Sequence, residues 1–145
     1  MINLLVPRNI EGRKEKLKQL NIKLLSQELI DGDLELDESF MDIDAKFVKI
    51  KKVNGFVWLT GKQWTEIPEW LKNVEILGSF LCAYNKLTTL KNCPHKIGRG
   101  FYCSHNLLTS LDGCPKNVEG DLYCYNNKVK LELPDYVDLK GKFVN

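Results

Sequence analysis

"IGRGFYC", residues 97–103, is one copy of a short pattern that recurs along most of this 145-residue chain. Each copy begins with an apolar residue, has glycine near its middle and ends on alternating side chains such as F-x-C. The other copies are IDGDLEL (30–36), VNGFVWL (53–59), ILGSFLC (76–82), VEGDLYC (118–124) and LKGKFVN (139–145). Their last residues are Leu36, Leu59, Cys82, Cys103, Cys124 and Asn145, which are 23, 23, 21, 21 and 21 positions apart. A fixed period of this length indicates a repeat architecture.

The second half of the unit recurs as well. NKLTTLKNCP (85–94) matches NLLTSLDGCP (106–115), and degenerate versions are KQWTEIPEWL (62–71) and NKVKLELP (127–134). In FLC, FYC and LYC the first and third side chains share one face, because side chains alternate along a strand. We therefore expect these residues to point inward. One unit cannot bury such a face alone, but a stack of units forms a continuous core.

Cysteine and histidine cluster in CPHKIGRGFYCSHN (93–106), whose two thiols and two imidazoles are suitable ligands for tetrahedral zinc. The five cysteines nevertheless occupy only two repeat positions, one with Cys93 and Cys114 and the other with Cys82, Cys103 and Cys124. Neither His95 nor His105 recurs in the neighbouring units. The register therefore favours free, buried thiols that act as small apolar side chains over a zinc site or a redox role. We predict no metal and no cofactor.

Two further columns are expected to shape the turns. Asn85, Asn106 and Asn127 recur just after the strand, where their amides can bond backbone groups that the turn leaves unpaired. A glycine column, which suits a tight turn before the strand, contains Gly32, Gly55, Gly78, Gly120 and Gly141. Arg99 interrupts that column, which predicts a small register shift in its unit.

The unit F-x-C-x-x-N-x-L-x-x-L resembles a leucine-rich repeat, whose pattern is L-x-x-L-x-L-x-x-N/C-x-L. LGSFLCAYNKL (77–87) fits this pattern throughout, whereas Gly98 and Glu119 replace the first leucine of two other copies. The resemblance covers residues 30–145 and implies an α/β repeat solenoid, a leucine-rich-repeat-like stack of five to six coils of short parallel strands. The CP-x-x-V-x-G-x-F-x-C-x-x-N style is similar to short repeat proteins of large bacteriophages and some bacteria.

We predict a single domain that consists of an N-terminal helical cap (1–29) and the solenoid (30–145). Residues 9–20 read as a helix with Asn9 as its N-cap. The expected apolar stripe of this helix is Ile10, Leu17, Leu20 and Leu24. Such a terminal element covers the open edge of the first coil. The opposite edge follows the last predicted strand, and pairing of that edge in a homodimer is a further hypothesis.

The outward strand positions are unusually apolar for a sheet face exposed to solvent. Exposed aromatic strips mark partner surfaces, and Tyr and Trp are enriched among interface anchors. The predicted partner-binding residues on this strip and its rim are Trp58, Leu81, Tyr102, Tyr123, Tyr125, Tyr84 and His105. Two alternatives are that the N-terminal segment covers the strip and that aromatic residues merely suit strands.

Composition limits the class of function. The chain is 43% apolar and 28% charged, with a net charge of +2, and no apolar run approaches the ~20 residues that a bilayer requires. Without a signal-peptide pattern, we predict a cytoplasmic protein. No Gly-rich phosphate loop, G-x-S-x-G or H-E-x-x-H occurs, so we predict no enzyme activity. Single-stranded nucleic-acid binding is an alternative. However, no lysine or arginine is interleaved on the strip, and contacts with phosphate dominate the affinity of proteins for nucleic acids.

The favoured function is a non-catalytic protein-binding module. Residues 28–44 contain eight Asp and Glu residues and no Lys or Arg. Such an acidic end beside the strip can steer a basic partner. The resemblance to bacteriophage proteins implies an inhibitor that binds a host or bacterial defence protein in the host cytoplasm.

Overall fold

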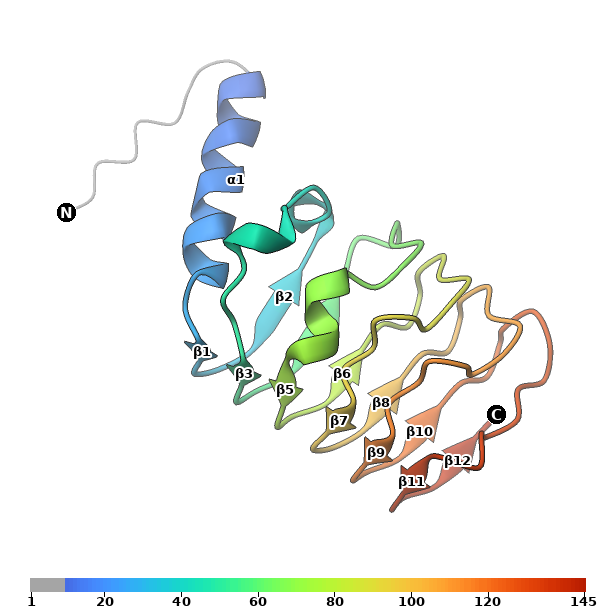
Figure 1. The fold of residues 1–145 in the computed structure, drawn as a ribbon. Coiled ribbons are helices and arrows are strands. Elements are labelled where there is room, and N and C mark those ends of the chain that lie inside the picture. The colour runs from blue at the N-terminus through green and yellow to red at the C-terminus, as the bar shows by residue number, and fades with distance from the viewer. Residues whose placement is uncertain (1–9) are drawn as a thin grey trace.

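The computed structural model of the chain describes residues 10–145. Six coils stack into a parallel-strand solenoid, and helix α1 (Ile10–Leu25) lies at its N-terminal end (Figure 1). The predicted repeat stack with a helical cap is therefore confirmed.

Each coil contributes one short strand to each of two parallel sheets. The first sheet consists of β1 (Leu29–Ile30), β3 (Lys52–Val53), β5 (Glu75–Ile76), β7 (Lys96–Ile97), β9 (Asn117–Val118) and β11 (Asp138–Leu139). The second sheet consists of β2 (Leu34–Leu36), β4 (Val57–Leu59), β6 (Phe80–Leu81), β8 (Phe101–Tyr102), β10 (Leu122–Tyr123) and β12 (Phe143–Val144). Short 3-10 helices occur at η1 (Glu38–Phe40), η2 (Ala45–Phe47) and η3 (Glu69–Asn73). The F-x-C pattern predicts only the second sheet.

The inward positions of the second sheet form the core that the alternation predicts. Phe80 pairs in register with Phe101, and their rings stack with centroids 5.7 Å apart. The inward side chains Phe80, Cys82, Phe101, Cys103, Leu122 and Cys124 are all fully buried. The leucines after the turn, Leu87, Leu90, Leu108 and Leu111, are also buried. Side chains at equivalent positions of successive coils therefore fill one continuous core.

An asparagine ladder joins neighbouring coils, as predicted from the repeat. The Asn106 amide donates to the carbonyl of Cys82 in the preceding coil at 2.9 Å and to that of Cys103 in its own coil at 3.1 Å. Its Oδ1 accepts from the backbone N–H of Leu87 at 3.0 Å. Asn85 and Asn127 make the equivalent contacts. Each amide thus satisfies backbone groups on two coils at once.

The glycine column lies at the bend before each strand of the second sheet, as predicted, and it also allows close approach between coils. A Cβ atom at Gly78 would lie 2.4 Å from the carbonyl oxygen of Gly55, and one at Gly141 would lie 2.4 Å from that of Gly120. Of this column only Gly32, in the first coil, has a positive φ, at 141°. In the later coils the turn therefore needs no positive φ, and close approach of the neighbouring backbone explains the glycine.

Arg99 occupies the glycine column without the predicted register shift. Its N–H donates to the Gly78 carbonyl at 3.1 Å, and its own carbonyl accepts from Gly120 at 2.9 Å. Phe80 still pairs directly with Phe101. The ladder therefore passes through Arg99 unbroken, and the expectation of a shift is wrong.

Helix α1 contacts the solenoid with its C-terminal half, and its first turns extend past the coils (Figure 1). Leu25 is fully buried, and the Asn21 amide donates to the Ser39 hydroxyl at 2.8 Å. The predicted apolar stripe is wrong, since Ile10, Leu17 and Leu20 are exposed and Leu24 is only half-buried. The helix is longer than predicted, and the expected N-cap Asn9 lies outside the described residues.

We expect Asn106→Ala to lower the free energy of unfolding by about 2–4 kcal/mol, because it leaves buried backbone groups on two coils without partners. Chemical denaturation followed by circular dichroism measures the change. The control Asn73→Ala removes an exposed amide and should alter stability by less than about 0.5 kcal/mol. Equal stability of the two variants would contradict a structural role for the ladder.

Candidate functional site

The outward positions of the second sheet form one column across all six coils. Parallel pairing aligns them in register, and neighbouring strands lie about 4.8 Å apart. In coil order the column is Glu35, Trp58, Leu81, Tyr102, Tyr123 and Val144. The fold therefore brings four of the predicted partner-binding residues side by side. We call Trp58, Leu81, Tyr102 and Tyr123 the aromatic strip.

Tyr102 and Tyr123 stack face to face across neighbouring strands. Their ring centroids are 5.0 Å apart with 4° between the planes, and both side chains are half-buried. A Cβ atom at Gly100 would lie 2.7 Å from the Tyr102 ring, so this ring covers the glycine. The Tyr123 hydroxyl donates to Asp121 at 3.2 Å, and this hydrogen bond and the nearby carboxylate charge raise the pKa of Tyr123. The two rings thus support each other, and the hydrogen bond to Asp121 further holds Tyr123 in place.

The remaining predicted residues form a rim beside the strip. Tyr84 and His105 stack with centroids 4.2 Å apart, and Tyr125 meets His105 edge-on at 5.4 Å. Tyr84 and His105 have left-handed backbones, with φ of 58° and 54°, which places them at equivalent turn positions of adjacent coils. The imidazole Nε2 lies 3.2 Å from the Asn126 amide nitrogen. His105 therefore belongs to an aromatic cluster on the surface.

Acidic side chains flank the strip at its first coil. Glu35 is the direct neighbour of Trp58 in the outward column, and its carboxylate accepts from the Thr60 hydroxyl at 3.3 Å. Asp37 accepts from the backbone N–H of Ser39 at 2.9 Å and thereby caps η1. The strip thus joins a carboxylate-rich end, as the sequence of residues 28–44 indicates.

The five cysteines are free and buried, as the repeat register predicts. Burial raises the pKa of every thiol, and that of Cys124 rises to about 11. The Cys103 thiol lies in the core, whereas His105 lies on the rim and His95 is exposed. Within residues 10–145 no group of three or more His, Cys, Asp or Glu side chains is placed to hold a metal.

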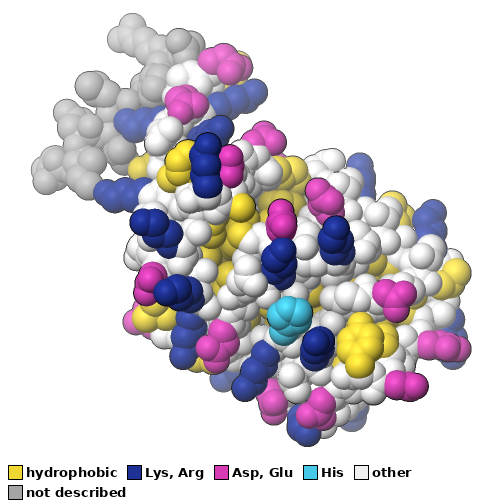
Figure 2. Space-filling model, in the orientation of Figure 1, with side chains coloured by type: hydrophobic (Ala, Val, Ile, Leu, Met, Phe, Trp, Pro, Cys, Tyr) yellow, Lys and Arg dark blue, Asp and Glu magenta, His cyan; other side chains and the backbone are white. Residues whose placement is uncertain are grey.

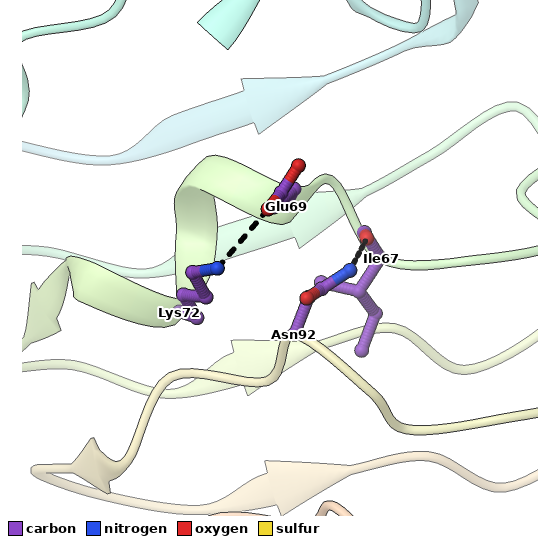
Figure 3. Close-up of polar contacts among 4 residues, drawn as sticks. All are labelled: Ile67, Glu69, Lys72 and Asn92. Carbon is purple, nitrogen blue, oxygen red and sulfur yellow. Dashed lines mark hydrogen bonds and ion pairs between the residues drawn. The ribbon is translucent and has the colours of Figure 1, made fainter.

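The loops of coils 1 to 3 line further hollows on the side of the solenoid that carries η2 and η3. Figure 3 shows polar contacts of the residues in and beside η3. There Lys72 pairs with Glu69 at 3.1 Å, and the Asn92 amide donates to the Ile67 carbonyl at 3.2 Å. The buried indole N–H of Trp70 has no hydrogen-bond partner among the described residues. Most of the polar groups shown here therefore satisfy one another locally.

Charge is mixed over the face seen in Figure 2, where basic and acidic side chains are interspersed. The exposed ion pairs of the described residues join side chains two or three positions apart, except that Lys51 pairs with Glu28 of the preceding coil at 2.9 Å. This arrangement gives no broad field of one sign on that face. None of the helices between residues 10 and 145 has the length and apolar character needed to cross a bilayer.

Comparison with known proteins gives no relative from which function could be transferred. No protein-family model matches the chain, and neither a curated protein nor a solved structure is significantly similar to it. Function must therefore be inferred from the aromatic strip and its rim.

We expect stability to fall as pH rises above about 8.5, where unfolded thiols ionise while the buried thiols stay protonated. Above this pH the unfolded state binds fewer protons than the folded state. The contribution of the thiols to folding stability is therefore complete below this pH and decreases above it. Each thiol lowers the free energy of unfolding by up to about 1.4 kcal/mol per pH unit. Urea denaturation between pH 7 and 10 measures the slope, and Cys82→Ala should make it shallower. An unchanged slope would contradict thiol linkage.

Proposed function

We propose that this chain is a non-catalytic protein-binding module that uses the aromatic strip and its rim. The observation that carries the proposal is the register-aligned column of Trp58, Leu81, Tyr102 and Tyr123 on the outer face of the second sheet. Trp58, Tyr84 and Tyr125 are exposed by 46%, 58% and 38%, so large apolar side chains remain available to a partner. Aromatic residues of this kind are typical anchors of protein interfaces.

Protein binding suits this surface better than single-stranded nucleic acid. Tyr102 and Tyr123 already stack on each other, so their shared faces are not open to bases. Glu35 continues the column beside Trp58, and a carboxylate there repels phosphate. Both features favour a partner with apolar and basic side chains.

The geometry around the histidines gives no support to catalysis. A nucleophile and its base must lie within hydrogen-bond reach of each other. Cys103 is wholly buried, and the imidazole of His105 lies beside an asparagine amide and two tyrosine rings. His105 therefore contributes contact surface in this proposal rather than proton transfer.

The resemblance of the repeat to short proteins of large bacteriophages supports a narrower role. In that role the chain binds a host or bacterial defence protein in the host cytoplasm and inhibits it. This part of the proposal comes from the sequence resemblance alone, and the strip would supply the contact surface.

We expect the combined substitution Tyr102→Ala and Tyr123→Ala to reduce capture of a specific bacterial protein by about tenfold or more, because hot-spot side chains dominate binding energy. Pull-down from bacterial lysate, with mass spectrometry to identify the captured protein, provides the measurement. A matched control is Lys52→Ala with Glu75→Ala in the first sheet. Circular dichroism checks that both variants fold. Unchanged capture by the folded tyrosine variant would remove the strip from the interface.

A further inference from the structure

A shallow hollow of about 390 Å³ lies where the strip meets its rim, between coils 2 and 3. Its lining includes Trp58, Thr60, Lys62, Ala83 and Tyr84. Trp58 and Tyr84 are the most exposed of the predicted partner-binding residues, at 46% and 58%. Two solvent-accessible aromatic rings therefore border the same concave surface.

The fold fixes both the opening and the wall of this hollow. Ala83 occupies the outward position that Tyr125 fills two coils later, so a small side chain leaves space between the rings. Tyr84 stacks on His105 at 4.2 Å, and His105 belongs to coil 4. The hollow is lined only by coils 2 and 3, so His105 supports the face of the Tyr84 ring that points away from the hollow. Such support reduces the side-chain entropy that binding must remove.

Two carboxylates adjoin the lining. The Glu35 carboxylate accepts from the hydroxyl of Thr60 at 3.3 Å. A Cβ atom at Gly61 would lie 2.6 Å from a carboxylate oxygen of Glu38, so this second acid lies against the Gly61 backbone. Lys62 is the one charged residue in the lining itself. Two negative charges therefore flank a hollow that contains one positive charge.

We propose that this hollow binds the guanidinium group of an arginine side chain presented by the protein partner. A guanidinium is planar, stacks on Trp and Tyr rings, and donates in a fork that matches carboxylates. It is less strongly hydrated than the ammonium of lysine, which favours its transfer to an aromatic site. The inference rests on the proposed protein-binding function and adds the chemistry of one anchor.

The test is a titration of the full chain with N-acetyl-arginine amide, followed by NMR at the indole N–H of Trp58. Trp64 and Trp70 are only 3% and 8% exposed, so the Trp58 signal reports on the surface. We expect saturable shifts with a Kd in the mM range, as is typical of a single side chain, on the order of 1–10 mM. N-acetyl-lysine amide should bind several-fold more weakly, and N-acetyl-leucine amide should cause no saturable shift.

Three variants separate local recognition from general charge. Glu35→Gln should weaken arginine binding about threefold or more, and Lys62→Gln should strengthen it, since the former removes an attraction and the latter a repulsion. Lys96→Gln makes the same charge change on the first sheet and should have no effect. An equal effect of the Lys62 and Lys96 variants would overturn the proposal. Absence of a saturable shift with arginine, or tighter binding of leucine amide, would also overturn it.

The outcome is separable from that of the proposed function. The double tyrosine variant leaves every residue of the hollow in place. If the variant loses capture and the unaltered chain does not bind arginine, the guanidinium site is refuted and the proposed protein-binding function still stands. If the chain binds arginine saturably and the variant captures its partner unchanged, the guanidinium site stands and the strip is removed from the interface.

Discussion

Backbone hydrogen bonding between coils is the constraint on which the rest of the structure depends. It holds each strand about 4.8 Å from its neighbours and fixes every residue directly above its equivalent in the next coil. The asparagine amides reinforce this spacing by bonding two coils at once, as Asn106 does. The same spacing excludes a side chain at positions such as Gly78, where the neighbouring carbonyl lies too close. The same spacing between coils therefore aligns the buried side chains in the core and the outward side chains on the surface.

This constraint also explains why the proposed binding surface is ordered before a partner arrives. The register that stacks Phe80 on Phe101 inside the solenoid stacks Tyr102 on Tyr123 outside it. Rings held by their neighbours lose less conformational entropy on binding than freely rotating ones. A small repeat protein can thus present a rigid apolar surface without a large core behind it. The carboxylate of Glu35 in the first coil adds negative charge at one end of that surface.

The sequence predicts those features that depend on the period alone. Burial of Cys82, exposure of Trp58 and the bonding of Asn106 all follow from repeat position, and the structure agrees. The first sheet was missed, although its signal is present as a recurring apolar column two residues before the glycine: Ile30, Val53, Ile76, Ile97, Val118 and Leu139. Features that depend on contacts outside the period were not predictable. The buried face of α1 is set by η1, and the hollow depends on how two rings border Ala83.

The equal length of the later coils has an evolutionary consequence. Coils with a 21-residue spacing share one hydrogen-bonding scheme, so a whole unit could be lost or duplicated while the remaining ladder stays in register. Each such event would change the width of the outer face by one strand spacing, or about 4.8 Å. The number of units therefore sets the length of the outer face, while the interior of each coil stays the same.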